Sequence, residues 1–477
     1  MRINKKTNRQ KDGKISRRDF LSGTAATAAA FTIVPQTVFG RGGSVAPSNR
    51  VNIAVIGTGG QGIHNIKELI KYSDAHITDL CDVNKVSDYS AFYYRGTAGL
   101  DPAKKYVETH YAKEKPSGTY KGCATHIDFR EMLDKENGID AVLVATPDHV
   151  HAVATMAAIK KGKHVYCEKP LTHSVYEARM IAEAARKAGV ATQMGNHGHS
   201  GEGIRLMCEW IWDGAIGPVR EVHVWSDVGY FNGKYNDRPK ETPPIHPGLN
   251  WDLWLGPAAY RPYHPAYAPF NWRSWWDFGT GALGDFGCHN MDSPFWALKL
   301  GSPTAIEGSS VRFNSEVIPS GNIVRYDFAA REGMPPVKLT WYDGGLRPPR
   351  PECLEKGRKM GGNGTIFIGD KGVIKCGGWS RSPRIIPETK MKTYKRPPRT
   401  LPRSKGHHRD WLDACKGGVP ASSNFDCAGP LTEMVLLGNV AMQTDKKLRW
   451  DGKNIKATNA PEADKYIRPP YRDGWTL

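Results

Sequence analysis

Short apolar runs alternate with amphipathic segments between Val51 and about Gly195. Each run is rich in Val, Ile, Leu and Ala and has the length of a single strand. Between the runs lie segments such as Val175–Lys187, in which apolar residues recur with the spacing of one helix face. Strands that alternate with helices predict a doubly wound parallel sheet of the α/β class. The predicted strands are Val51–Ile56, His76–Asp82, Ala141–Ala145, His164–Cys167 and Ala191–Met194.

After Gly195 the pattern becomes strand-like, following a helix expected from about Gly203 to Trp212. Apolar and polar residues alternate in Val219–Trp225, and similar runs follow without long helices between them, which predicts a mostly antiparallel sheet in a second, α+β domain. Gly369–Gly372 has the composition of a hairpin turn. The other predicted strands and helices of this domain are Ala305–Val311, Val324–Ala329, Val337–Tyr342, Gly364–Ile368, Gly372–Cys376, His407–Cys415 and Gly429–Thr444.

Residues 1–40 differ from the rest of the chain. Basic residues precede Ser16-Arg-Arg-Asp-Phe-Leu21, and a weakly apolar run of Ala, Thr and Gly follows. A twin arginine in this context is typical of the signal read by the Tat export system; the alternative is a disordered basic tail. The expected organisation is therefore a signal segment at 1–40, a Gly/Pro/Ser-rich linker at 41–49, a first domain at 50–195 and a second at 196–477. No apolar stretch approaches the roughly 20 residues that would span a bilayer.

The formal net charge is +18. Basic residues are dense between Lys390 and Arg409, but this segment is rich in Pro and no nucleic-acid recognition motif accompanies it. We therefore expect no nucleic-acid partner.

A glycine-rich turn follows the first strand. Gly57-Thr58-Gly59-Gly60-Gln61-Gly62 matches the G-x-G-x-x-G fingerprint of dinucleotide-binding Rossmann domains. The first glycine permits the tight turn, the second allows pyrophosphate to approach the backbone, and the third allows close helix packing. Asp82 lies twenty residues after Gly62, where a carboxylate accepts hydrogen bonds from ribose and repels a 2′-phosphate. NAD is therefore favoured over NADP, although Lys85 lies nearby. The predicted contacts from this region are Gly57, Gly59, Gly60, Gln61, Gly62 and Asp82.

Two further motifs end predicted strands of the same sheet. Ala145-Thr-Pro-Asp-His-Val-His151 follows the third strand, and Glu168-Lys169-Pro170 ends the fourth. Ligands of open α/β sheets bind outside the carboxyl ends of the strands, so both motifs are expected beside the cofactor. The predicted cofactor contacts here are Thr146, Pro147, His151, Glu168 and Lys169. The long connection Phe92–Tyr120 is expected to be a helix-containing insertion next to them.

These motifs resemble those of the Gfo/Idh/MocA family, named for glucose–fructose oxidoreductase and inositol dehydrogenase. The resemblance is carried by the glycine turn, by Ala145–His151, by Gly162-Lys-His-Val and by Glu168–Pro170, and it is looser after Met194. It implies a large open sheet in the second domain, through which subunits of the family commonly associate, so a homo-oligomer is expected. It also implies that Lys169 contacts substrate and tunes the catalytic base. The alternative for Lys169 is a solvated side chain at a strand end.

The resemblance further implies a D-x-x-x-H pair in the second domain, and Asp285 with His289 supplies one. If this segment is helical, residues four apart share a face, so the two side chains project together. His289 is expected to take the proton of an alcohol while hydride leaves the carbon, and Asp285 to orient the ring or bind a neighbouring hydroxyl. The alternative is an Asp near a helix start with a packed His.

Two other segments are candidates for substrate contact. His197 and His199 follow the fifth strand, and one of them is expected to hydrogen-bond substrate. The pair lacks a Cys or carboxylate partner nearby, so no metal site is expected. Trp272 and Arg273 lie in a region crowded with Trp and Tyr, where an aromatic face can stack on a sugar ring; packing is the alternative for most of these rings.

Together these features predict an exported oxidoreductase that transfers a hydride from a secondary hydroxyl of a sugar, glycoside or cyclitol to NAD. Because Tat carries folded proteins, the NAD is expected to be loaded before export and to be tightly bound. Two alternatives stay open. Some relatives use NAD transiently as redox-neutral glycosidases, through oxidation, elimination, hydration and reduction. A non-catalytic carbohydrate-binding protein on the same scaffold would need a defective site, whereas Lys169, Asp285 and His289 are all present.

Overall fold

Residues 49–230, 235–311 and 314–477 are described by a computed structural model of the chain. Within them, Val51–Leu477 form one compact unit. The predicted signal segment 1–40 and all but the last residue of the predicted linker 41–49 lie outside the described residues.

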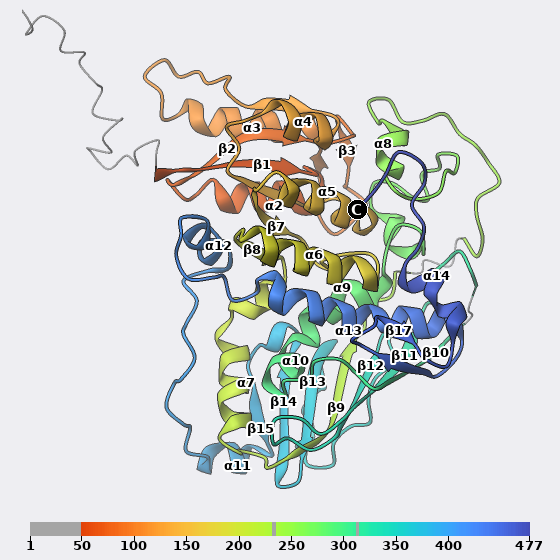
Figure 1. Cartoon of the computed structure of the whole chain (residues 1–477). Coiled ribbons are helices and arrows are strands. Elements are labelled where there is room, and N and C mark those ends of the chain that lie inside the picture. Colours follow the sequence, from red (N-terminus) through yellow and green to blue (C-terminus); the bar gives the residue numbers. More distant parts are fainter. Residues whose placement is uncertain (1–48, 231–234, 312–313) are drawn as a thin grey trace, which may run out of the picture. The chain divides into compact units, whose positions relative to one another are not determined.

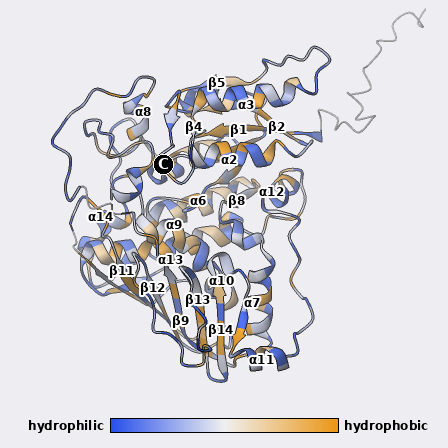
Figure 2. Ribbon diagram, turned by 180° about the vertical axis from the view of Figure 1, so that it is seen from behind, coloured by the Kyte–Doolittle hydropathy of each residue, from blue (hydrophilic) through white to orange (hydrophobic). Residues whose placement is uncertain are grey.

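The first half of this unit contains a parallel sheet of six strands (Figure 1). Its order is β5-β2-β1-β6-β7-β8, and each neighbouring pair is parallel. The central strands read as continuous apolar runs because both faces are covered, and Figure 2 shows them mainly in the hydrophobic colour. The strands are β1 (Val51–Ile56), β2 (Ala75–Cys81), β5 (Ala124–His126), β6 (Ala141–Val144), β7 (His164–Cys167) and β8 (Thr192–Met194).

Alternate residues of β1 enter two different cores. Ile53 and Val55 pack in the core that also contains residues of α2 and α3, whereas Ala54 and Ile56 pack in the core shared with α4, α5 and α6. Helix α12 (His407–Cys415), from the second half of the chain, contributes Trp411 to the first of these cores. The other helices of this layer are α2 (Gly60–Leu69), α3 (Leu100–Ala112), α4 (Phe129–Lys135), α5 (Asp148–Lys160) and α6 (Val175–Ala188).

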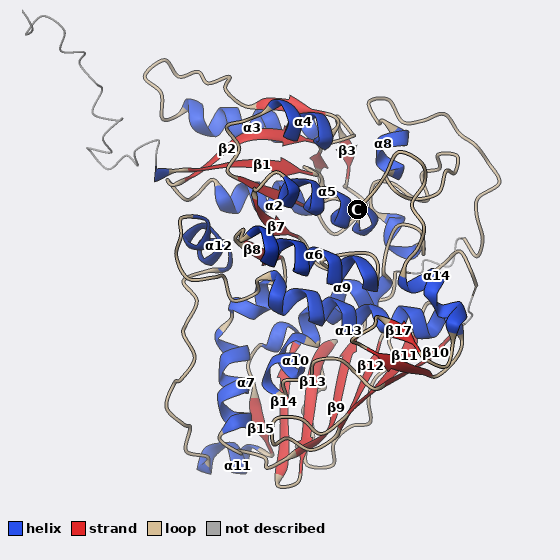
Figure 3. Ribbon diagram, viewed as in Figure 1, coloured by secondary structure: helices blue, strands red, loops and turns tan. Residues whose placement is uncertain are grey.

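A second sheet has nine strands in the order β15-β14-β13-β9-β12-β11-β10-β16-β17. All of its pairs are antiparallel except β9 with β12 (Figure 3). Gly369 pairs with Gly372, which leaves Asp370 and Lys371 as a two-residue hairpin turn, as the sequence predicts. The strands are β9 (Val219–Ser226), β10 (Ala305–Ser310), β11 (Asn322–Phe328), β12 (Val337–Tyr342), β13 (Asn363–Gly369), β14 (Gly372–Gly377), β15 (Arg384–Ile386), β16 (Leu448–Asp451) and β17 (Lys456–Ala457).

Helix α13 (Phe425–Thr444) joins the two sheets. It packs against α6 of the first layer and against β10 and α9 of the second (Figure 1). Its buried side chains, such as Leu431 and Val435, belong to a core that continues from the parallel sheet into the large sheet. The remaining helices are α7 (Glu202–Trp212), α8 (Trp251–Leu255), α9 (Gly281–Asn290), α10 (Asp292–Ala297), α11 (Glu388–Thr393) and α14 (Asp464–Ile467), with short 3-10 turns η5 (His197–Ser200), η6 (Asn271–Ser274), η7 (Gly378–Ser380) and η8 (Pro461–Ala463).

The predicted fold class is confirmed: a doubly wound parallel sheet precedes an α+β part with a large, mostly antiparallel sheet. The insertion Phe92–Tyr120 contains β4 (Thr97–Ala98), which pairs with β3 (Ser87–Asp88), and then α3. Because one core runs through both layers, the domain boundary at 195/196 stays a prediction. Among the described residues, no helix combines the length and apolarity needed to cross a bilayer.

Candidate active site

A cleft with an empty volume of about 1160 Å³, its open mouth included, lies at the carboxyl ends of β1, β2, β6 and β7. Segments of the second half of the chain, around α8, η6 and α9, form its other wall. Among the predicted site residues, the cleft is lined by Gly57, Gly59, Gly60, Gln61, Asp82, Thr146, Pro147, His151, Glu168, Lys169, Trp272, Arg273 and Asp285. Gly62, His197, His199 and His289 are not among its lining residues.

The glycine turn has the geometry that its three key positions require. Gly57 has a φ of +85°, and a Cβ there would lie 2.6 Å from the carbonyl oxygen of Ala145. A Cβ at Gly62 would lie 1.9 Å from the carbonyl oxygen of Gly57, so α2 can pack on the turn only without a side chain. Helix α2 begins at Gly60, and its N-terminus faces the cleft, where the helix dipole favours phosphate. These residues fit a dinucleotide.

Asp82 holds this turn in place. Its Oδ2 accepts hydrogen bonds from the N–H of Thr58 at 2.7 Å and from Thr58 Oγ1 at 3.0 Å, and its Oδ1 accepts one from the N–H of Asn84 at 2.8 Å. Burial raises the pKa of the carboxyl, against these hydrogen bonds, which lower it. Each carboxylate oxygen can accept more than one bond, so ribose binding by Asp82 stays a prediction.

His151 joins the loops that follow β6 and β7. Its Nδ1 lies 2.7 Å from the carbonyl oxygen of Pro170, and its Nε2 lies 2.9 Å from that of Thr146. Carbonyl oxygens only accept, so the ring can pair with both of them only in its protonated form. Burial lowers the pKa of His151, but Cys167, Asp148 and the Pro170 carbonyl outweigh it and raise the pKa to about 9.

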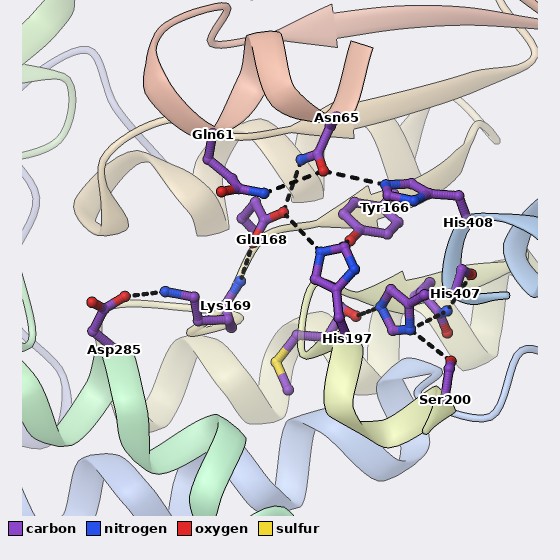
Figure 4. A network of polar contacts seen from close by, with 12 residues as sticks. Gln61, Asn65, Tyr166, Glu168, Lys169, His197, Ser200, Asp285, His407 and His408 are labelled. Atoms are coloured by element: carbon purple, nitrogen blue, oxygen red, sulfur yellow. Dashed lines mark hydrogen bonds and ion pairs between the residues drawn. The ribbon is translucent and has the colours of Figure 1, made fainter. Parts of the chain in front are cut away.

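Lys169 is paired across the cleft. Its Nζ donates to Asp285 Oδ1, while the hydroxyl of Tyr230 donates to Asp285 Oδ2 (Figure 4 shows the Lys169 contact). Burial lowers the pKa of Lys169, but the charge of Asp285 and the neighbouring Tyr94 and Glu168 outweigh it and raise the pKa to about 12. Lys169 is therefore an ammonium that can donate to a substrate oxygen. Glu168, at the same strand end, accepts a 2.8 Å hydrogen bond from Asn65 Nδ2 (Figure 4).

Asp285 and His289 lie four residues apart within α9, as the sequence predicts. His289 is buried, and its Nδ1 has no hydrogen-bond partner among the described residues. The ring lies 5.3 Å from the ring of Trp379, centroid to centroid. Burial, followed by the charge of Lys169, lowers the pKa of His289 well below its usual value. The ring is therefore neutral, and its role as the catalytic base stays a prediction.

The two histidines after β8 have different surroundings, and neither lines the cleft. His197 Nε2 lies 3.3 Å from the hydroxyl of Tyr166 and 4.0 Å from Glu168 Oε1 (Figure 4). His199 and Asp292 are each only 1% exposed, and Nδ1 of the ring lies 2.8 Å from the carboxylate. The other face of His199 stacks on Trp296 at 4.5 Å. His199 is therefore buried against Asp292 and Trp296, and substrate binding by either histidine stays a prediction.

Arg273 presents an unpaired charge to the cleft. Its guanidinium lies over the rings of Trp272 at 4.1 Å, Phe270 at 4.3 Å and Tyr230 at 5.8 Å. It forms no ion pair with the carboxylates in the described part of the chain. Trp272 lines the same wall but is mostly buried.

Sequence reasoning missed two side chains beside these residues. Tyr230 contacts Asp285, and Trp379 contacts His289, but Tyr230 lies in a loop and Trp379 in the three-residue turn η7, and neither segment is long enough to show a periodicity. Trp379 has a φ of +58°, which is rare for a bulky residue and is held by a hydrogen bond from its N–H to Asn290 Oδ1 at 3.1 Å. The only sequence feature that points to aromatic side chains at the site is the high content of Trp and Tyr in this part of the chain, and it does not distinguish these two residues from the others.

One group in the described residues has metal-ligand spacing: Asp79, His126 and Glu136, whose ligand atoms lie within 4.8 Å of one another. None of the three lines the cleft. The expectation that the site needs no metal ion stays a prediction.

Three family models match the chain. Residues 51–196 match the NAD-binding Rossmann fold of the Gfo/Idh/MocA oxidoreductase family, and residues 211–329 match an α/β C-terminal domain of that family. Residues 14–33 match the twin-arginine translocation signal, which confirms the predicted route of export through the Tat pathway.

Among curated proteins, the chain is 38% identical over 110 residues to the 1,5-anhydro-D-fructose reductase of Ensifer adhaerens, which is 23% of this chain and 33% of that protein. It is 32% identical over 154 residues to a glycosyl hydrolase family 109 protein of Stenotrophomonas maltophilia, which is 32% of this chain and 29% of that protein. The chain thus matches only about a third of the length of these relatives.

Among solved structures, the fold is similar to that of the WlbA dehydrogenase from Bordetella pertussis, solved in complex with NADH and UDP-GlcNAcA. The TM-score is 0.55 at 15% identity, over 84% of this chain and 99% of that one. At this identity the similarity concerns the fold alone.

Proposed function

Because the chain belongs to the Gfo/Idh/MocA family of NAD-binding oxidoreductases, we propose that it oxidises a secondary hydroxyl of a sugar, glycoside or cyclitol with tightly bound NAD. The observation that carries the proposal is the pairing of Lys169 with Asp285 on the lining of the same cleft that contains the glycine turn, with Tyr230 donating to Asp285 from behind. Relatives named for 1,5-anhydro-D-fructose, levoglucosan and inositol support this substrate class.

The chemistry supplied by bound NAD is acceptance of a hydride from the carbon that carries the hydroxyl. Lys169, as an ammonium, donates a hydrogen bond to the substrate oxygen and stabilises the negative charge that develops there. His289, which lies beside the cleft and not on its lining, is the proposed acceptor of the hydroxyl proton, since its Nδ1 has no partner in the described part of the chain. Asp285 holds Lys169 and, one helical turn before His289, sets the position of the substrate hydroxyls. Arg273 and Trp272 contact the substrate from the wall that also carries Asp285 and that faces Lys169.

Preference for NAD over NADP follows from Asp82. Its carboxylate lines the cleft at the end of β2, where a 2′-phosphate would bring a second negative charge. Tight binding accords with Tat export, because this route carries folded proteins to a compartment with little free dinucleotide. We further propose that the exported protein is a homo-oligomer, as is common in the family.

A second candidate is the redox-neutral glycosidase. Tyr230 favours this function. Its phenol is hydrogen-bonded to Asp285 and is a second acid–base group next to Lys169. The glycosidase reaction needs such a second group, because a proton must be removed from the carbon next to the transient ketone. The similarity to a glycosyl hydrolase family 109 protein supports the same alternative. A non-catalytic carbohydrate-binding protein is disfavoured, because the cleft retains a charged Lys and an unpaired neutral His beside it.

The test uses protein purified with its native cofactor and a panel of sugars and aryl glycosides. Nicotinamide absorbance and released products are followed in one sample. Lasting reduction of the cofactor without release of an aglycone supports the dehydrogenase. Aglycone release with return of the cofactor to its oxidised form supports the glycosidase, and neither signal with any substrate contradicts both.

A further inference from the structure

The hairpin of β3 and β4, Ser87–Ala98, covers the glycine turn. The strands are antiparallel, and the N–H of Tyr89 donates to the carbonyl of Gly96 at 2.7 Å. The base is fixed to the chain on both sides, since the N–H of Leu100 donates to the carbonyl of Asn84 at 3.1 Å. Four of its residues are aromatic: Tyr89, Phe92, Tyr93 and Tyr94.

Two of these rings lie directly on the glycines. A Cβ at Gly59 would lie 2.4 Å from the hydroxyl of Tyr89, and a Cβ at Gly60 would lie 2.3 Å from the ring of Tyr94. Burial raises the pKa of Tyr89 to about 12, against the N–H of Gly60, which also acts on the Tyr89 hydroxyl and lowers its pKa. In the G-x-G-x-x-G arrangement, this face of the turn and its N–H groups receive the pyrophosphate. The two tyrosines and a pyrophosphate therefore compete for the same space and the same donor.

The outer part of the hairpin reaches the opposite wall of the cleft. The ring of Phe92 stacks on that of Phe270, with centroids 4.8 Å apart and an angle of 19°, and Tyr94 meets the same ring edge-on at 6.2 Å. Phe270 in turn lies under the guanidinium of Arg273. By contrast, Tyr93 is 83% exposed and contacts only Tyr94 among these rings.

We propose that the aromatic hairpin is a gate that limits exchange of the dinucleotide, an inference that rests on the proposed function. Tyr89 and Tyr94 leave the glycines when the dinucleotide enters, and the stack of Phe92 on Phe270 holds the hairpin over the cleft. Opening requires this stack to separate, so both entry and exit of the cofactor are slow. A gate of this kind explains how an exported enzyme retains its NAD without a covalent bond.

The experiment measures association and dissociation of NADH by stopped-flow fluorescence on the full chain, with excess NAD as the chase. Phe92→Ala removes the stack, and we expect both rate constants to rise by at least about 5-fold, since an aromatic pair of this kind contributes a free energy equivalent to roughly 2- to 10-fold beyond its buried area. The matched control is Tyr93→Ala, on the same hairpin, which leaves both rates unchanged. Phe270→Leu weakens the stack from the other wall and gives the same test if Phe92→Ala does not fold.

Tyr89→Phe tests the displacement step. It removes the hydroxyl that competes for the N–H of Gly60, so we expect NADH to bind about 3- to 10-fold more tightly. Weaker binding by Tyr89→Phe, or rates in Phe92→Ala that equal those of Tyr93→Ala, would overturn the gate while leaving the proposed function intact. Absence of NADH binding in wild type and variants alike would contradict the proposed function and the gate together.

Discussion

Lys169 and Asp285 are 116 residues apart in the chain and form an ion pair on the wall of the cleft. One comes from the end of a strand in the parallel sheet, and the other from a helix that packs under the large sheet. The pair therefore exists only when the two layers are assembled around α13. This geometry joins the predicted cofactor site to the predicted substrate site.

The first prediction concerns the ammonium of Lys169. Lys169→Met removes the donor that stabilises charge on the substrate oxygen, so we expect kcat/KM to fall by about 10²- to 10⁴-fold while NAD binding persists. Turnover of the substrate found in the panel and NADH fluorescence titration measure the two effects. Lys187→Met, on the exposed end of α6, is the matched control. Equal activity in the two variants would remove Lys169 from the mechanism.

The second prediction concerns the pH dependence of activity. Asp285 is the strongest group that raises the pKa of Lys169 to about 12, against burial, which lowers it. Asp285→Asn removes this charge, so the pKa of Lys169 falls and the alkaline limb of the kcat/KM profile moves to lower pH. Tyr230→Phe is the control, because it removes a hydrogen bond to Asp285 but keeps its charge. An alkaline limb that does not move in Asp285→Asn would mean that Lys169 does not titrate in this reaction.

The sequence predicts those parts of the site that depend on local geometry. The glycine turn is one such part, because the close contacts of Gly57 and Gly62 are made within a strand, a turn and the next helix. The helical spacing of Asp285 and His289 is another. The expectation that Asp285 and His289 act together with Lys169 is implied instead by the family resemblance, since spacing along a chain does not predict a contact between distant segments.

The parts that the sequence does not predict depend on tertiary packing in irregular segments. Tyr230 reaches the site from a loop and Trp379 from the short 3-10 turn η7, and neither segment has a periodicity that would indicate a direction. The strands of the hairpin Ser87–Ala98 are only two residues each, too short for an alternation to be visible. Helix α13 begins at Phe425 rather than Gly429, because the side chain of Asn424 caps it by accepting a hydrogen bond from the N–H of Asp426, and Pro430 lies inside the helix. His199 alternates with His197 in sequence, yet Asp292 and Trp296 hold it away from the cleft.

The third prediction concerns stability as a function of pH. The pKa of His151 is raised from 6.5 to about 9 in the folded protein, so the protonated ring stabilises the fold. Its contribution is fully present below pH 6.5 and is lost as the pH rises through about 9. The full contribution is on the order of 3 kcal/mol. We expect the free energy of unfolding of wild type and His151→Gln to differ more at about pH 6 than at about pH 10, which urea titrations measure. A difference that is constant across this range would show that the ring is not protonated.

The fourth prediction concerns the packing of α2 on the glycine turn. A Cβ at Gly62 would lie 1.9 Å from the carbonyl oxygen of Gly57, and backbone atoms on both sides cannot move apart without disturbing β1 and α2. We therefore expect Gly62→Ala to lower the free energy of unfolding by about 1–3 kcal/mol and to weaken NADH binding, because the turn must shift. Gly138→Ala is the matched control, since a Cβ there meets no atom within 4 Å. Urea unfolding and NADH titration of both variants measure the two effects. If Gly62→Ala binds NADH as tightly as Gly138→Ala does, the turn accommodates the methyl group, and the close packing of the third glycine is not what shapes this site.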